Sequence, residues 1–259
     1  MNFFTALRFL TIFPAPAAKD GAELPVGRAL PYFPAVGLLV GVILAALYWA
    51  LRLVFPQIIV AALLVAYLAV ITGAHHLDGL IDTCDALVAG RTKEQRLAIM
   101  SDTRVGAFGI TGVCILLLTK FAALSGTTSL AVLAITPALS RWALGGVILS
   151  FPAAKNQGMG ADTKSSTNLA GFAWSTALCL AIAIIFAGLI DGPLLMLALF
   201  ALVCCLALLL NRLFGGLTGD CYGAMIEIGE ALTLLLAVAL LPLTQQLPGH
   251  GLLRLTLPS

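Results

Sequence analysis

The sequence predicts an all-α integral membrane protein, a bundle of about seven transmembrane helices that forms a single domain over residues 1–259. Hydrophobic residues make up 61% of the chain and charged residues only 10%, whereas soluble domains carry about 25% charged residues. The mean hydropathy is +1.06. No stretch alternates with a period of two residues, and backbone that faces lipid must satisfy its own hydrogen bonds, so we expect helices and no regular sheet.

Seven apolar runs approach or reach the roughly 20 residues that cross a bilayer. They are Phe33–Leu51, Ile58–Ala74, Ala107–Leu124, Leu130–Ser150, Phe172–Ile190, Leu194–Leu210 and Ala231–Leu247. We therefore assign residues 33–247 to the transmembrane bundle and residues 1–32 to a cytoplasmic or interfacial segment that precedes it.

The amino-terminal stretch has a signal peptide as its alternative interpretation, but Arg8 interrupts the apolar core and no basic stretch precedes it. We expect a retained amphipathic helix that lies at the membrane interface and ends before Pro14 and Pro16. Its apolar residues are Phe3, Phe4, Leu7 and Leu10.

The connections between the runs are either short or long, and the long ones are polar. With seven spans, the long connections (1–32, 75–106, 151–171 and 211–230) all fall on one side. They contain ten of the fourteen Lys and Arg residues and eleven of the twelve acids. The positive-inside rule places this side in the cytoplasm, so we expect the chemistry to face the cytoplasm.

Composition and motifs exclude several classes of function. A net charge of +2 is too small to indicate binding to nucleic acid. The six cysteines lack the spacing of a metal site or a disulfide framework. The chain contains neither a Walker-type ATP motif nor a G-x-S-x-G nucleophile elbow.

A row of acids follows the second apolar run. Asp78, Asp82 and Asp85 are four and three residues apart, which places them within about a 60° arc of a helix. Carboxylates so close together repel one another unless they are solvated, protonated or share a cation. Hard oxygen ligands suit Mg²⁺, Mn²⁺ or Ca²⁺. We expect a divalent metal here, the alternative being an ordinary solvated face.

The stretch SDTRVGAFG adds two further candidates. Asp102 is a fourth candidate metal ligand, or a cap for a helix that begins near Val105. Arg104 offers a planar fork to phosphate, or is a snorkelling residue at a helix start.

Four more residues carry candidate roles. Asp220 and Glu227 are seven residues apart and would share a helical face, so either could act as a metal ligand, a catalytic base or a substrate contact. Lys155 could meet phosphate from a Gly-rich loop, unless residues 152–168 are a mobile linker. Arg141 lies within a span and should point inward, to an acid or to a substrate phosphate.

Two other polar residues have structural interpretations. Lys120 lies near the outer end of its span and should snorkel to the interface. His75 would lie on the face of the acid row, where capping or hydrogen bonding is favoured over metal ligation.

Several stretches together resemble the cobalamin synthase family, the adenosylcobinamide-GDP ribazoletransferases. They follow the order of the family along nearly the whole chain: ALRFLTIFPAP, FPAVGLLVG, HLDGLIDTCDAL, IMSDTRVGAFG, RW at 141–142 and GLTGDCYGAMIEIGE. The combination of HLDG-x-x-D-x-x-D with SDTRVGAFG is specific, whereas any single piece is weak. The Ala-Arg pair of the CDP-alcohol phosphotransferase motif is missing, because Asp82 and Thr83 stand in its place.

The resemblance implies that α-ribazole, or its 5′-phosphate, attacks the phosphate nearer the corrinoid in adenosylcobinamide-GDP. GMP leaves, and adenosylcobalamin or its 5′-phosphate forms, in the last steps of cobalamin biosynthesis. The resemblance also implies dependence on Mg²⁺ and a place in the bacterial inner membrane. It leaves open which acceptor is preferred, and which oligomeric state the chain adopts, a homo-oligomer included.

On this interpretation the residues divide into three roles. Mg²⁺ held by the acids would bridge the pyrophosphate, Arg104 and Arg141 would clamp the phosphates, and Asp82 or Glu227 would accept the proton of the attacking hydroxyl. The acids in question are Asp78, Asp82, Asp85 and Asp102.

Two alternatives remain. A CDP-alcohol phosphotransferase acting on a CDP-lipid would release CMP. A cation-coupled transporter would place acids near the bilayer midplane and show inverted repeats, whereas the sequence places the acids at one edge and shows no repeat.

Overall fold

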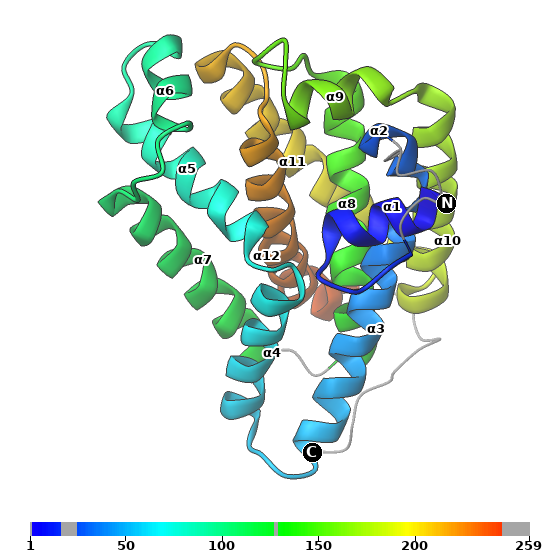
Figure 1. Ribbon diagram of the computed structural model, residues 1–259. Helices are drawn as coiled ribbons and strands as arrows, with labels where there is room; N and C mark the ends of the chain where they lie inside the picture. The colour runs from blue at the N-terminus through cyan, green and yellow to red at the C-terminus, as the bar shows by residue number, and fades with distance from the viewer. Residues whose placement is uncertain (1, 17–24, 127–128, 245–259) are drawn as a thin grey trace.

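A computed structural model describes residues 2–16, 25–126 and 129–244, and over these residues every regular element is a helix (Figure 1). The all-α prediction is therefore confirmed. The elements are α1 (Asn2–Leu10), α2 (Val26–Ala29), η1 (Leu30–Tyr32), α3 (Phe33–Arg52), α4 (Gln57–Ile71), α5 (His75–Ala89), α6 (Lys93–Ile99), α7 (Ala107–Gly126), α8 (Leu130–Ser150), α9 (Met159–Ser166), α10 (Leu169–Ala187), α11 (Asp191–Phe214) and α12 (Gly219–Thr244).

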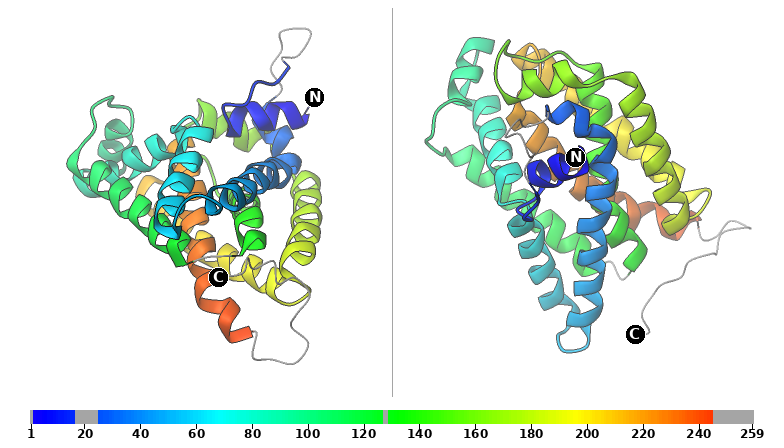
Figure 2. Two further views of the ribbon diagram at one scale, coloured as in Figure 1. Left: turned by 90° about the horizontal axis from the view of Figure 1, so that it is seen from below. Right: turned by 45° about the vertical axis from the view of Figure 1, so that its right-hand side comes forward.

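Helix α8 is the centre of the bundle. Within its apolar stretch 94% of the residues are buried inside the protein. Helices α3, α10, α11 and α12 pack around it, as the two views of Figure 2 show. Five other single helices are long enough to cross a membrane, and only 22–61% of the residues in their apolar stretches are buried inside the protein. These helices therefore keep a face for lipid.

The closest helix packing joins α3 to α8, and two glycines on α3 make it possible. A Cβ atom on Gly41 would overlap the carbonyl oxygen of Ala134, and one on Gly37 would overlap that of Pro137. The two glycines are four residues apart, the spacing with which small residues bring two membrane helices into backbone contact. The motif FPAVGLLVG therefore has a packing role.

The predicted spans are confirmed as helices, with changed boundaries. Six single helices in the described part of the chain are long and apolar enough to cross a membrane, and the count rises to seven if α4 and α5 form one bent span. The predicted amino-terminal helix is α1, which ends before Pro14 and buries Ala6, Leu7 and Leu10. Its place at the membrane interface stays a prediction.

Two of the predicted long polar connections are largely helical. Residues 75–106 contain α5 and α6, and residues 211–230 contain the end of α11 and the start of α12. Only residues 215–218 connect α11 to α12, where the chain turns at Gly215 (φ 69°) and Gly216 (φ 143°). The predicted span Ala231–Leu247 therefore begins too late, because residues 219–230 are helical as well although they contain three acids. Residues 245–247 of that span lie outside the described residues.

A sharp break separates α4 from α5. Gly73 and Ala74 both have positive φ angles, of 61° and 58°, and the axes of the two helices meet at 89°. After the break α5 packs along α12 and α7. The sequence places the acid row directly after the second apolar run. In the structure the row lies on a separate helix that is bent away from α4.

Three of the four long connections meet at one end of the bundle, as predicted. Helices α6 and α9 and the turn between α11 and α12 lie together at the top of Figure 1. An isolated β-bridge between Ala153 and Leu217 joins two of these segments. The assignment of this end to the cytoplasm stays a prediction.

We predict that Gly41→Ala destabilises the protein by about 1–3 kcal/mol, because the added methyl group forces α3 away from α8. The loss of folded, monodisperse protein on heating in detergent measures the effect. Gly126→Ala is the matched control, since a Cβ atom there meets nothing within 4 Å. Equal melting of the two variants would contradict the proposed packing.

Candidate active site

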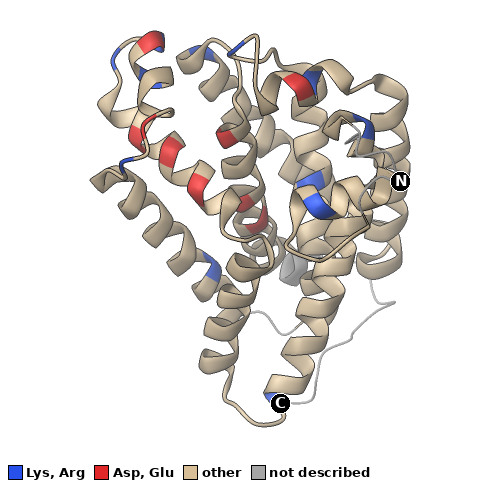
Figure 3. Ribbon diagram, viewed as in Figure 1, with Lys and Arg blue, Asp and Glu red and all other residues tan. Residues whose placement is uncertain are grey.

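The three acids of the predicted row share one helix, α5, with spacing that places them on one side. Asp78 is exposed, and Asp82 and Asp85 are partly exposed. Figure 3 shows acidic residues gathered along α5 and on the neighbouring α12. The row is therefore accessible from the end of the bundle at which the connecting segments collect.

Helix α12 brings a fourth carboxylate to the row, that of Asp220. The backbone of Asp220 lies so close to Gly79 that a Cβ atom on the glycine would stand 2.7 Å from the Asp220 carbonyl oxygen. The negative charges of Asp220, Asp78 and Asp85 all act on the carboxylate of Asp82. The four carboxylates thus form one site of concentrated negative charge, in which the charges of the other three act on Asp82.

The acids form a row and do not surround one point. Among the described residues, no group of three or more His, Cys, Asp or Glu side chains is arranged to hold a metal ion. Protein Mg²⁺ sites commonly use one or two carboxylates and take their remaining ligands from water and substrate phosphates. The donor set fits Mg²⁺ only in this shared form, with the substrate supplying oxygens.

Asp85 is engaged by the start of α7. Its Oδ2 accepts a hydrogen bond from the backbone N–H of Gly106 at 2.7 Å, and its Oδ1 accepts one from Gly109 at 2.8 Å. The Gly106 N–H directly precedes α7 and the Gly109 N–H lies in its first turn, where no partner within the helix is available. The helix cap that was one of the two predicted roles of Asp102 is therefore supplied by Asp85.

Asp102 and Arg104 pair with each other. The Nε and Nη2 atoms of Arg104 donate to the Asp102 carboxylate, the shorter bond being 2.6 Å. These hydrogen bonds hold the pKa of Asp102 at about 2. The pair lies at the surface, with the Arg104 side chain 88% exposed, so both groups can exchange this partner for a ligand at little cost.

Lys155 reaches the same end of the bundle from the connection between α8 and α9. Its Nζ atom donates to Oγ of Ser101 at 2.9 Å, and its positive charge acts on Asp220. The surrounding segment is ordered by the hydrogen bond from Ala154 N to the Leu217 carbonyl, 2.9 Å, and by α9. Much of residues 152–168 is thus helical or hydrogen bonded, which favours the interpretation of this segment as part of the site over that of a mobile linker.

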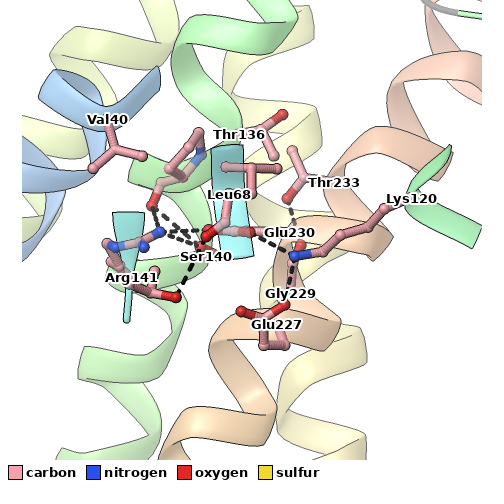
Figure 4. A network of polar contacts seen from close by, with 12 residues as sticks. Val40, Leu68, Lys120, Thr136, Ser140, Arg141, Glu227, Gly229, Glu230 and Thr233 are labelled. Atoms are coloured by element: carbon pink, nitrogen blue, oxygen red, sulfur yellow. Dashed lines mark hydrogen bonds and ion pairs between the residues drawn. The ribbon is translucent and has the colours of Figure 1, made fainter. Parts of the chain in front are cut away.

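A second group of charges lies deep in the bundle, away from the acid row (Figure 4). Lys120 on α7 donates to Glu227 at 2.6 Å and to Glu230 at 2.7 Å. Arg141 on α8 donates to the other oxygen of Glu230 at 2.7 Å. We call these four residues the buried ion network; each side chain is at most 2% exposed.

The buried ion network balances two positive against two negative charges. That balance matters because an unpaired charge within a membrane bundle is costly, and removing one partner of a buried pair costs about 3–5 kcal/mol. The network therefore locks α7, α8 and α12 together.

The buried ion network bears on three predictions, of which the one for Arg141 is confirmed. Lys120 does not snorkel, because it is enclosed and paired with two glutamates. Arg141 points inward to an acid, Glu230, which is one of its two predicted partners. Glu227, a candidate base, is enclosed beside Lys120, so the structure does not bring it to the acid row.

Sequence reasoning missed two features that shape the site. Glu230 was overlooked as a partner, although its spacing of three residues from Glu227 in an apolar helix was a signal. The second is the contact between α5 and α12. A Cβ atom on Gly223 would stand 3.2 Å from the His76 Cα atom, and nothing in the sequence alone indicates this neighbour.

Comparisons with known proteins agree on one family. The profile of cobalamin-5-phosphate synthase matches residues 2–238. A protein of Roseiflexus sp. (strain RS-1) named adenosylcobinamide-GDP ribazoletransferase is 38% identical over 232 residues, which cover 88% of this chain and 86% of that protein.

Two further relatives carry the same name. The protein of Geotalea daltonii is 36% identical over 92% of this chain and 97% of its own length. The protein of Vibrio parahaemolyticus is 31% identical over 92% of this chain and 91% of its own length. No solved structure matches the chain.

We predict that Lys120→Met alone destabilises the protein by about 3–5 kcal/mol, because it leaves an uncompensated glutamate in the bundle. The double variant Lys120→Met with Glu227→Gln restores charge balance, and the pair of Arg141 with Glu230 remains. We expect the double variant to recover folded protein, as measured by thermal unfolding in detergent.

The same double variant tests the role of Glu227. We expect it to keep GMP release from adenosylcobinamide-GDP, the reaction that the resemblance implies, within about tenfold of the wild-type rate. A folded double variant whose rate falls by the roughly 10²–10⁴-fold expected for loss of a general base would make Glu227 catalytic after all.

Proposed function

The chain belongs to the cobalamin-5-phosphate synthase family, and on that premise we propose that the acid row is the active centre of an adenosylcobinamide-GDP ribazoletransferase. One observation carries the proposal. Asp220, which lies far from the row in sequence, packs against it through Gly79 and acts on the charge of Asp82. A phosphoryl-transfer enzyme needs such a concentration of charge at an accessible edge.

In the proposed reaction the hydroxyl of α-ribazole, or of its 5′-phosphate, attacks the phosphorus nearer the corrinoid. A new P–O bond forms, the bond from that phosphorus to the bridging oxygen breaks, and GMP leaves with the bridging oxygen. The hydroxyl proton passes to a base on the protein. Positioning and charge neutralisation are the main demands of this chemistry.

Two cations are suited to hold the phosphates. Arg104 presents an exposed guanidinium whose present partner, Asp102, lies at the surface. Lys155 is exposed and its charge already reaches the acid row at Asp220. We assign phosphate binding to these two residues. Arg141 does not join them, since it is enclosed and bonded to Glu230.

Asp82 is our assignment for the base. Partial burial, and after it the negative charges of Asp220, Asp78 and Asp85, raise the pKa of Asp82 to about 6, which favours uptake of a proton. It is partly exposed, so an attacking hydroxyl can approach it. Glu227, the other candidate, is bonded to Lys120 within the bundle.

Mg²⁺ suits the donor set of the row, and Asp78 and Asp82 are the carboxylates free to ligate it. Among the described residues, neither of these two side chains accepts a hydrogen bond. Bound there, the ion would neutralise charge that develops on the phosphate oxygens. Asp220, which packs against the row at Gly79, and Asp102, in the segment between α6 and α7, are the further carboxylates that would contribute.

The long apolar helices support an integral membrane protein. We propose the bacterial inner membrane, with the acid row facing the cytoplasm. The reason is that ten of the fourteen Lys and Arg residues lie in the long connections between the spans. A surface site would let an amphipathic corrinoid rest against lipid while its polar nucleotide end reaches the acids.

We predict that Asp78→Asn and Asp82→Asn each lower the rate of GMP release by about 10²–10⁴-fold, because each removes a ligand or a base from the reacting centre. Purified full-length protein is incubated with adenosylcobinamide-GDP, α-ribazole and Mg²⁺, and both GMP and cobalamin are quantified. Asp162→Asn, an exposed acid on α9, is the matched control and should keep the wild-type rate.

Three outcomes would count against the proposal. Wild-type rates from Asp78→Asn in excess Mg²⁺ would remove the acid row from the chemistry. Release of CMP from a CDP-lipid, without GMP release from the corrinoid substrate, would indicate a CDP-alcohol phosphotransferase. Uptake of a labelled solute into proteoliposomes, again without GMP release, would favour a transporter.

A further inference from the structure

The carboxylate of Asp85 differs from the other acids of the row in what it contacts. Its two oxygens accept backbone hydrogen bonds of 2.7 and 2.8 Å from Gly106 and Gly109. Helix α7 begins at Ala107, so these N–H groups precede and complete its first turn. A negative charge at this point also complements the positive end of the helix dipole.

The glycines at both contacts are required by this arrangement. A Cβ atom on Gly106 would overlap Oδ1 of Asp85, and one on Gly109 would stand 2.5 Å from Oδ2. The motif SDTRVGAFG therefore carries its glycines so that the backbone of α7 can approach the Asp85 side chain. These two glycines make room for the Asp85 carboxylate and not for a ligand.

The cap also fixes a segment that carries two candidate site residues. Residues 100–106 connect α6 to α7 and contain Asp102 and Arg104. At its far end the segment contacts the turn that precedes α12, where Oγ1 of Thr218 donates to Sδ of Met100 at 3.8 Å. At its near end the only described side-chain anchor to α5 is the hydrogen bond from Gly106 to Asp85.

We propose that Asp85 is a positioning residue that holds α7 and the segment bearing Arg104 against α5, and that it is not a metal ligand. This inference rests on the proposed function, because it concerns how Arg104 reaches the substrate phosphates. It removes one acid from the predicted metal-binding set and leaves the α5 ligands to Asp78 and Asp82.

Gly109→Ala tests this inference without changing any charge. The methyl group displaces the Asp85 carboxylate, so Gly109→Ala should reproduce the effect of Asp85→Asn. We expect both variants to raise KM for adenosylcobinamide-GDP by roughly tenfold, about what losing a helix cap costs. The double variant should exceed neither single variant, because both remove the same contact.

Two further measurements separate positioning from metal binding. The Mg²⁺ concentration that gives half the maximal rate should stay within about twofold of wild type in both variants. Hydrogen exchange over residues 104–112 should accelerate in both variants in EDTA, and Mg²⁺ added to wild-type protein should leave the protection of these amides unchanged.

Gly112→Ala is the matched control for the interface. Its methyl group enters the same contact between α7 and α5, but against Sγ of Cys84, and it should leave KM unchanged. If Asp85→Asn does not fold, Gly109→Ala decides alone, since it retains the carboxylate.

Two results would overturn the proposal. One is a tenfold rise in half-saturating Mg²⁺ for Asp85→Asn without such a rise for Gly109→Ala, and the other is an unchanged KM for Gly109→Ala. Failure of the proposed function would look different, because wild-type protein itself would then release no GMP.

Discussion

The close crossing of α5 and α12 is the contact on which the site depends. Gly79 faces the backbone of Asp220, and Gly223 faces that of His76, so the two helices meet without side chains between them. This crossing brings the charge of Asp220 to Asp82. If the two helices lay further apart, α5 would carry a solvated row of acids and α12 a single isolated acid, Asp220. The concentrated charge that phosphoryl transfer needs would then be absent.

The buried ion network holds α12 at the depth and rotation that this crossing requires. Glu227 lies two helical turns below Asp220 on the same side of α12, and Lys120 holds it there from α7. Through Glu230 the network also reaches Arg141 on the enclosed helix α8. The charges of the buried ion network thus serve to assemble three helices, and the acid row that we propose as the active centre is separate from them.

Carboxylates take three different roles in this one chain, according to the donors within reach. Asp82 is surrounded by other carboxylates and keeps its oxygens available. Asp85, three residues further along the same helix, meets two backbone N–H groups. Glu227 meets an ammonium group in a dry interior. A carboxylate can therefore bind a metal, cap a helix or pair with a cation, and its neighbours decide whether its oxygens remain available to a substrate.

The sequence by itself determined the helical membrane class, most of the span positions, the acid row and the family, because these follow from composition, local periodicity and motif order. It did not reveal the break at Gly73 and Ala74, the early start of α12, or the partners of Lys120 and Asp85. These features depend on how the helices pack against one another. A polar residue that indicates a loop in the sequence can form an ion pair or cap a helix once a distant helix lies beside it.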